Sequence, residues 1–323
     1  MRAVPLLVVG VFLMARLYGA GFVEDFATDP GARGWRTFGD AESFHWNALE
    51  QDLEVTWDSS KPNSYFYRSL GNILARTDDV QLSFDLQIAD IAVGVSPDKP
   101  FTFELAVGLM NVRDATATNF LRGTATESPN LLEWDYFPDS GFGATISPVI
   151  VSSNNQFIPS FTVPVELTAN HVYHVQLSYS AADQTLNTTM LRDGASIGPI
   201  KPVQLGAAFT DYRVDTVAIS SYSDEGADGS ILAHGRIDNL AVTLPDPPRP
   251  FLAWEGTPAG KAWQITFQST TNWSYTLERT DDWKQWLQVS NPVPGNGAEQ
   301  TLQDQSMSEA PPQAFYRVRL ERP

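Results

Sequence analysis

Short runs of alternating apolar and polar residues recur along the chain and constrain its fold more than any other feature. Clear examples are VQLSFDLQI (80–88), YHVQLSYS (173–180) and TLNTTML (185–191), and clusters of Gly, Pro, Asn and Asp separate such runs. Successive side chains of a strand point to opposite faces, so each run predicts a strand with one buried face. Many short strands with turn residues between them predict an all-β protein, a β-sandwich of the jelly-roll kind.

One of these runs carries an unusual amount of charge. In LLEWDYFPDSG (131–141), Glu133, Asp135, Phe137 and Asp139 occupy every second position and are therefore expected on one face of a strand. Carboxylates gathered on one face of an apolar strand predict a metal site, a catalytic site or a polar face.

The overall charge narrows the classes of partner. The chain has 38 acidic against 21 basic residues, a formal net charge of -17. An acidic surface repels phosphate groups, which argues against nucleic acid and against anionic membrane surfaces as partners. There is no cysteine, which excludes thiol nucleophiles and cysteine-ligated zinc.

The N-terminus, MRAVPLLVVGVFLMARLYGAG, predicts a signal peptide over residues 1–21. A basic residue precedes a short apolar stretch, and small residues follow at the distance expected for cleavage. A membrane anchor is the alternative, but Arg16 interrupts the apolar run. The expected protein is secreted or bound to the cell surface, without membrane insertion after cleavage.

A proline-rich stretch, PDPPRP (245–250), predicts a linker between two domains. The predicted sandwich covers residues 22–244. Residues 251–323 contain five of the nine tryptophans and several strand-like runs, which predict a small C-terminal β domain.

The acidic strand and its neighbours resemble a known family. The stretch EWDYFPD (133–139) resembles the metal-binding strand of legume lectins, and YHVQLSYSAADQTLNTTML resembles a lectin strand–turn–strand. The segments FVEDFATDPGARGW and GRIDNLAVTLP resemble the first and last strands of concanavalin-A-like and laminin-G-like sandwiches. The resemblance covers residues 22–244.

The resemblance implies a set of metal ligands. Glu133 and Asp135 would be ligands, with Asp135 able to bridge two ions. Phe137 would contribute its backbone carbonyl, and Asp139 would stand where the family usually has Asn. The family also has a downstream Asp and His, and SGFGATISPV (140–149) has neither. Calcium is therefore favoured over a transition metal.

A second acidic stretch, SDEGADGS (223–230), is a candidate to complete a calcium site. Asp224 and Asp228 lie in this glycine-containing loop, which does not match the EF-hand pattern. The alternative is a solvated acidic turn.

The same strand also allows two other interpretations. Concanavalin-A-like sandwiches include retaining glycosidases, and in an enzyme Glu133 would be the nucleophile with Asp135 as its helper. The second Glu of that motif is missing here, since Phe137 or Pro138 takes its place. In the other interpretation arginine side chains close off the carboxylates, which then only support the fold.

Aromatic residues are the candidates for contacts with sugar rings. Sugar sites combine flat aromatic faces with a few polar groups. The predicted ligand-binding residues are Trp46, Tyr65, Tyr67 and Trp134, with Tyr65 and Tyr67 on one strand face and Phe66 on the other. The stretch DDWKQW (281–286) is a further aromatic candidate.

The C-terminal segment has a resemblance of its own. The stretch WSYTLERTDDWKQWLQVS, followed by FYRVRLER, resembles a small β module found at the end of secreted bacterial surface proteins. This resemblance implies a bacterial extracellular or periplasmic protein and a module for attachment or spacing.

Together these observations favour a secreted, noncatalytic carbohydrate-binding protein whose partner is an extracellular glycan or polysaccharide. A glycoside hydrolase or polysaccharide lyase that uses Glu133 and Asp135 is the first alternative. A structural or adhesive surface protein without a small-ligand site is the second.

Overall fold

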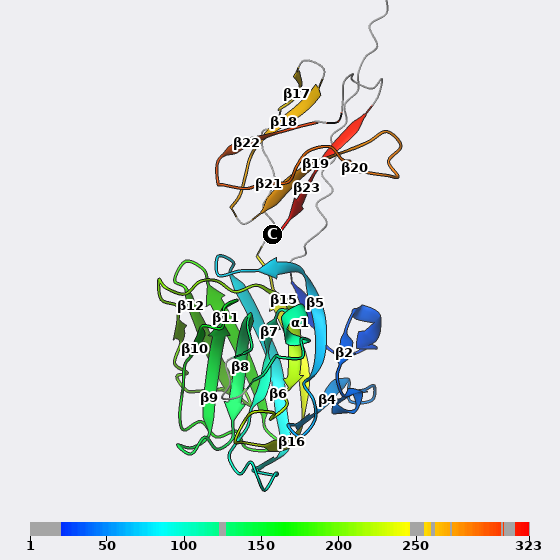
Figure 1. Ribbon diagram of the computed structural model, residues 1–323. Coiled ribbons are helices and arrows are strands. Elements are labelled where there is room, and N and C mark those ends of the chain that lie inside the picture. Colours follow the sequence, from blue (N-terminus) through cyan, green and yellow to red (C-terminus); the bar gives the residue numbers. More distant parts are fainter. Residues whose placement is uncertain are drawn as a thin grey trace, which may run out of the picture. The chain divides into compact units, whose positions relative to one another are not determined.

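The computed structural model describes most of the chain. The described residues are 21–122, 127–245, 255–259, 262–271, 273–304, 306 and 314–322. Most of the predicted signal peptide, most of the linker and Trp254 lie outside them. The chain divides into two compact units, Ala20–Pro245 and a unit that contains Asp246–Pro323 (Figure 1). The division falls at the start of the predicted linker.

The larger unit contains two β-sheets, and within the described residues every pairing between its named strands is antiparallel. The nine described strands of one sheet are β13 (Ala195–Ile197), β12 (Thr185–Arg192), β11 (Val172–Ser180), β6 (Val80–Val93), β16 (Ile231–Thr243), β4 (Asp52–Asp58) and β3 (Phe44–Asn47), in that order, with β1 (Phe22–Glu24) beside β16 and β14 (Val203–Gln204) beside β12. The seven described strands of the other are β10 (Phe157–Pro159), β9 (Thr145–Val151), β8 (Leu131–Phe137), β7 (Leu105–Met110), β15 (Val214–Ser221), β5 (Ser64–Leu74) and β2 (Arg36–Phe38).

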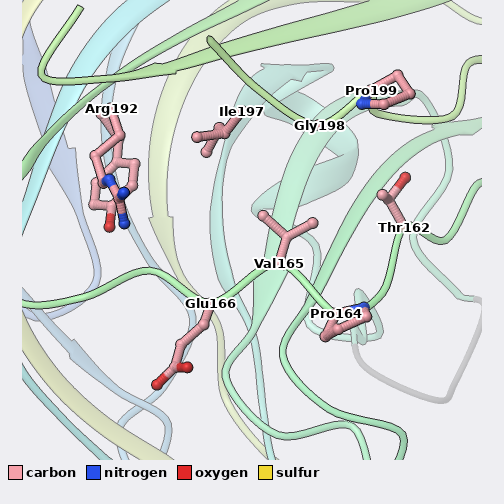
Figure 2. Close-up of a pocket in the computed structure, with 9 residues that line it drawn as sticks. Thr162, Pro164, Val165, Glu166, Arg192, Ile197, Gly198 and Pro199 are labelled. Atoms are coloured by element: carbon pink, nitrogen blue, oxygen red, sulfur yellow. The ribbon is translucent and has the colours of Figure 1, made fainter. Parts of the chain in front are cut away.

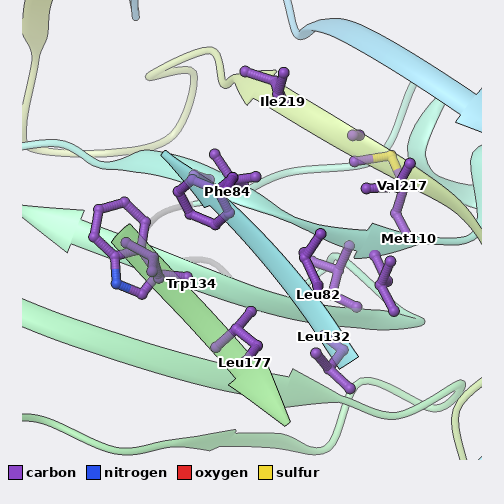
Figure 3. Close-up of a cluster of buried hydrophobic side chains, with 14 of the residues drawn as sticks. Leu82, Phe84, Met110, Leu132, Trp134, Leu177, Val217 and Ile219 are labelled. Carbon is purple, nitrogen blue, oxygen red and sulfur yellow. The ribbon is translucent and has the colours of Figure 1, made fainter. Parts of the chain in front are cut away.

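The core lies between the two sheets. Leu82 and Phe84 of β6 belong to the same buried cluster as Leu132 and Trp134 of β8 (Figure 3). The rings of Phe84 and Trp134 meet edge to face with their centroids 5.7 Å apart. The predicted sandwich is therefore confirmed: the apolar positions of strands from different sheets pack against each other.

The nine-stranded sheet has one buried and one solvated face, as the alternating runs predict. Along β6 and β11, buried positions alternate with partly exposed ones. Polar pairs occupy the solvated face, and Nδ1 of His174 lies 2.7 Å from Oδ1 of Asp85 on the neighbouring strand. His171 pairs with a different aspartate, Asp193, so the two nearby histidines do not share a site.

The seven-stranded sheet departs from this pattern because both of its faces are covered. All six residues from Leu131 to Tyr136 of β8 are buried, as are all seven of β9. The segment around the short helix α1 (Val112–Ala115) contributes to the cover: its Ala115 carbonyl accepts a hydrogen bond from the Tyr65 hydroxyl of β5. The acidic strand is thus an interior strand of the fold.

The smaller unit is also built from strands. Its described strands are β17 (Glu255–Ala259), β18 (Ala262–Gln268), β19 (Ser274–Thr280), β20 (Leu287–Gln288), β21 (Val293–Pro294), β22 (Glu299–Gln303) and β23 (Phe315–Glu321). They form one sheet of β17, β18 and β22 and a second sheet centred on β19. Trp263 stacks on Tyr316 in a separate core, with ring centroids 4.2 Å apart.

One strand begins later than its sequence pattern predicts. The run FTFELAVGLM (101–110) predicts a strand from its first residue, whereas β7 begins at Leu105.

Among the described residues there is no helix of the length and hydropathy needed to cross a membrane.

Candidate functional site

Glu133 and Asp135 share a face of β8, as their spacing predicts. Leu132 and Trp134, on the opposite face, contribute to the core between the sheets, so the two carboxylates lie on the outer face of the seven-stranded sheet. That face is not open to solvent: Glu133 is 0% and Asp135 1% exposed.

Small residues on the neighbouring strands leave room above the sheet. Gly108 of β7 pairs with Glu133, and Ala106 pairs with Asp135. On the next strand, Ala218 pairs with Gly108. A Cβ atom on Gly108 would lie 2.5 Å from Cγ of Glu133, so any larger residue would displace the carboxylate. The space is instead available to side chains that lie across the sheet.

Arg122 occupies this space and is the cation at the centre of the site. Its Nη2 lies 2.6 Å from Oδ2 of Asp135, and its Nε lies 3.1 Å from Oε2 of Glu133 and 3.5 Å from Oε1 of Glu104. The guanidinium is also 5.5 Å from the ring centroid of Tyr222, whose hydroxyl donates a hydrogen bond to Glu133. We call Glu104, Arg122, Glu133, Asp135 and Tyr222 the arginine cluster.

The charges of the arginine cluster do not balance when all three carboxyl groups are ionised. Burial raises the pKa of Asp135 well above its usual value, and the repulsion of Glu104 and Glu133 adds to this while Arg122 opposes it. Burial likewise raises the pKa of Glu133. Burial alone would lower the pKa of Arg122, but Asp135, Glu104 and Glu133 outweigh it and raise that pKa. The cluster therefore favours a permanently charged guanidinium and, at Asp135 above all, retention of a proton.

The tyrosine of the cluster stays neutral for the same reason. Burial raises the pKa of Tyr222 well above its usual value, and the nearby Glu133 carboxylate raises it further. A neutral phenol keeps its hydrogen, which it donates to Glu133. The hydrogen bond compensates part of the cost of burying that carboxylate.

The predicted calcium ligands do not fit a calcium ion in this arrangement. The guanidinium of Arg122 already lies on Glu133 and Asp135, where a divalent ion would have to bind. The carboxylate of Asp139 accepts a hydrogen bond from the backbone of Gly141 in its own turn, and Phe137 ends the strand. Among the described residues, no group of three or more His, Asp or Glu side chains is arranged to hold a metal ion.

Asp224 and Asp228, the predicted additional calcium ligands of residues 223–230, have other surroundings in the structure. Oδ1 of Asp224 forms an ion pair of 2.7 Å with Lys99, and its Oδ2 accepts a hydrogen bond of 2.9 Å from Ser59. Asp228 is exposed, and its backbone carbonyl accepts a hydrogen bond from Phe101. A lysine, not a metal ion, thus neutralises the acidic loop at Asp224.

The predicted catalytic pair is equally enclosed. A nucleophile and an acid must both reach the glycosidic bond, at about 5 to 5.5 Å from each other in a retaining enzyme. Glu133 and Asp135 bind one arginine and have almost no exposed surface. The interpretation that arginine closes off the carboxylates describes this strand best.

Two of the four predicted sugar-binding rings have no free face, which corrects their interpretation. Trp134 is 0% exposed because it faces the opposite sheet. Tyr65 is also 0% exposed: it stacks on Phe38 at 5.5 Å and meets the edge of Tyr222 at 5.8 Å. As predicted, Phe66 lies on the other face from Tyr65, in the core against Trp35.

The other two predicted rings remain partly accessible. Trp46 lies on β3 and donates a hydrogen bond of 2.9 Å from its indole nitrogen to the carbonyl of Phe26. Tyr67 lies on β5, half-buried against the core. Their role in sugar binding stays a prediction.

The structure adds a groove that sequence reasoning missed. It has a volume of about 400 Å³, and we call it the edge groove (Figure 2). Its lining combines apolar and charged side chains from two separate segments and the start of β11: Thr162, Pro164, Val165, Glu166, Tyr173, Arg192, Ile197, Gly198 and Pro199. No spacing pattern links these segments, so only the folded chain reveals the groove.

The two charged residues of the edge groove are available to a ligand. Glu166 and Arg192 lie toward one end of it, and Thr162 and Pro199 toward the other (Figure 2). Both charged residues are exposed. Within the described part of the chain, neither side chain forms a hydrogen bond or an ion pair.

Comparisons with known proteins find similarity among solved structures alone. No family model matches the sequence, and no curated protein matches it either. Among solved structures, the chain is similar to peanut lectin with a nine-residue peptide (14% identity, 70% of this chain and 98% of that one, TM-score 0.44). It is also similar to lectin UEA-II in complex with galactose (14% identity, 69% and 98%, TM-score 0.46). A third similar structure is a Bacillus subtilis protein of unknown function with a galectin-like fold (11% identity, 70% and 96%, TM-score 0.41).

The larger unit is an antiparallel β-sandwich, and these lectin and galectin-like structures are similar to it in fold. The predicted fold class is confirmed. At these identities the likeness concerns the fold and carries no residue roles with it.

Proposed function

We propose that this protein is a secreted, noncatalytic carbohydrate-binding protein that binds an extracellular glycan in the edge groove. The lectin-type sandwich supports the class of function at the level of fold. The observation that carries the proposal is the lining of the groove, where apolar surface adjoins an anion and a cation that have no hydrogen-bond or ion-pair partner among the described residues.

This lining suits the two kinds of surface that a sugar ring presents. The C–H faces of a pyranose are apolar and would lie against Pro164, Val165 and Ile197. Its hydroxyl groups would donate to the carboxylate of Glu166 and accept from the guanidinium of Arg192.

The charge of the protein favours a neutral glycan. A formal net charge of -17 repels polyanionic polysaccharides over the whole surface. Calcium is not part of the proposed binding mode, because three of the predicted calcium ligands, Glu133, Asp135 and Asp224, form ion pairs with Arg122 or Lys99. Recognition would then rest on direct contacts with the protein.

A glycan array probed with the mature full-length chain tests the proposal. Arg192→Ala and Glu166→Gln should each weaken binding to the recognised glycans about tenfold or more, because the first removes and the second weakens a charge-assisted hydrogen bond of about 1.5 to 3 kcal/mol. Glu42→Gln is the matched control, since Glu42 is exposed on another part of the sandwich. Unchanged binding by both groove variants, or no binding to any glycan by the wild type, would contradict the proposal.

A further inference from the structure

The smaller unit presents an exposed tryptophan on a fixed turn. Trp283 lies in the loop between β19 and β20 and is 44% exposed. Its backbone φ is 62°, in the left-handed region that bulky residues rarely adopt. Such strain persists only where the surroundings impose it, and it is frequent at binding sites.

Hydrogen bonds within the loop impose this conformation. Oγ1 of Thr280 accepts from the backbone N–H of Trp283 at 3.0 Å. Oδ1 of Asp282 accepts from the backbone N–H groups of Lys284 at 2.8 Å and Gln285 at 3.1 Å. The backbone of the turn is therefore fixed before any ligand arrives, which lowers the entropy cost of binding.

A second tryptophan forms a corner with the first. The rings of Trp283 and Trp286 lie 5.9 Å apart at an angle of 81°. Phe315 supports Trp283 from β23 with a centroid distance of 4.1 Å, and Arg317 lies 4.2 Å from the ring centroid of Trp286. We call Trp283 and Trp286 the tryptophan corner.

The rim of the tryptophan corner is polar. Asp281, Lys284 and Gln285 are exposed on the same loop. Together they offer a carboxylate, an ammonium and an amide beside the aromatic rings. This combination matches a pyranose, whose apolar face stacks on an aromatic ring while its hydroxyls need polar partners.

The size of the apolar surface argues against a protein partner. A stable protein–protein interface buries about 800 Å² on each side. Among the described residues of the smaller unit, the exposed large hydrophobic side chains are only Trp283 and Leu287. That surface is sufficient for one or two sugar rings and too small for the core of a protein interface.

We propose that the tryptophan corner is a second carbohydrate-binding site, which takes a pyranose ring of a neutral extracellular polysaccharide. It goes beyond the proposed function because it lies on the other unit and shares no residue with the edge groove. Two sites on one chain would bind a repeating polymer with greater avidity than either site alone.

The test measures retention of the full-length chain on insoluble cellulose, chitin and starch. Trp283→Ala should weaken binding to the retained polysaccharide at least tenfold, and Trp283→Tyr, which keeps an aromatic ring, should restore part of it. Phe142→Ala is the matched control, because Phe142 is 88% exposed on the larger unit. Thermal unfolding checks that all variants are folded.

Iodide quenching of tryptophan fluorescence gives a second readout. The polysaccharide should protect the wild type from quenching more than it protects Trp283→Ala, because the stacked ring is shielded. Equal retention and equal protection for wild type and Trp283→Ala would overturn the proposal, as would a wild type that none of the three polymers retains. Arg192→Ala separates the two sites. If Arg192→Ala loses binding on the glycan array while Trp283→Ala is retained on the polysaccharide like the wild type, the edge groove is supported and the tryptophan corner is contradicted.

Discussion

The guanidinium of Arg122 lies 2.6 Å from the carboxylate of Asp135, and neither side chain has more than 2% of its surface exposed. Glu133 and Glu104 share the same cation. Removing one partner from such a buried group leaves uncompensated charge, which costs more than the pair itself contributes. The arginine cluster is therefore expected to control the stability of the sandwich.

Arg122→Met tests this directly. The variant keeps most of the side-chain volume but leaves three buried carboxyl groups without their cation, so we expect a loss of about 3 to 5 kcal/mol in the free energy of unfolding. Urea unfolding followed by intrinsic fluorescence measures it.

The companion variant removes the charges together. Arg122→Met combined with Glu133→Gln and Asp135→Asn should recover part of the lost stability, because neutral amides cost less to bury than carboxylates. If Arg122→Met alone unfolds at the wild-type urea concentration, the cluster has no such role.

Calcium should leave the stability of the wild type unchanged. A metal ion at a hundred times its dissociation constant would add about 2.7 kcal/mol, which shifts the melting temperature by several degrees. Because Arg122 already forms ion pairs with the carboxylates of Glu133 and Asp135, we expect the same melting temperature in millimolar calcium and in chelator. A calcium-dependent rise that disappears in Asp135→Asn would restore the interpretation of the strand as a metal site.

Much of the fold follows from local pattern. The alternation in residues 80–88 and 173–180 predicts strands with one solvated face, and β6 and β11 have that burial. The same rule places Glu133 and Asp135 together on β8. A period of two is a property of the backbone, so it can be deduced without knowledge of the neighbours.

What covers each face cannot be deduced in this way. Arg122 comes from an irregular segment 11 residues before Glu133, where no periodicity indicates its direction. The sequence allows an arginine to close off the carboxylates, but 21 basic residues compete for that place. Likewise, Tyr65 is of a residue type that is common in sugar-binding sites, but the segments packed on the outer face of its sheet bury it.

The pH dependence of stability should show the raised pKa of Asp135. In the unfolded chain this carboxyl group has a pKa of about 4, whereas burial raises its pKa in the folded protein. Between the two pKa values the folded protein binds more protons than the unfolded chain, so stability falls as pH rises. This contribution is complete below about pH 4 and is lost as pH rises through the folded pKa.

Urea unfolding from pH 4 to pH 8 measures this slope. Asp135→Asn should flatten the decline, whatever its effect on absolute stability, because the asparagine does not titrate. Asp139→Asn is the matched control, since Asp139 is an exposed aspartate in the turn that follows the same strand. Identical slopes for wild type and Asp135→Asn would mean that this group does not retain its proton in the fold.

Gly108→Ala tests the space above the sheet. The added Cβ would lie 2.5 Å from Cγ of Glu133 and 2.5 Å from the carbonyl oxygen of Leu132. Neither atom can move freely, because Arg122 and Tyr222 hold the carboxylate and the carbonyl belongs to β8. Overpacking of this kind costs about 1 to 3 kcal/mol. Gly206→Ala, where a Cβ would have no neighbour within 4 Å, is the matched control in the same urea experiment. Equal stabilities for the two variants would show that the arginine cluster can shift to admit a methyl group.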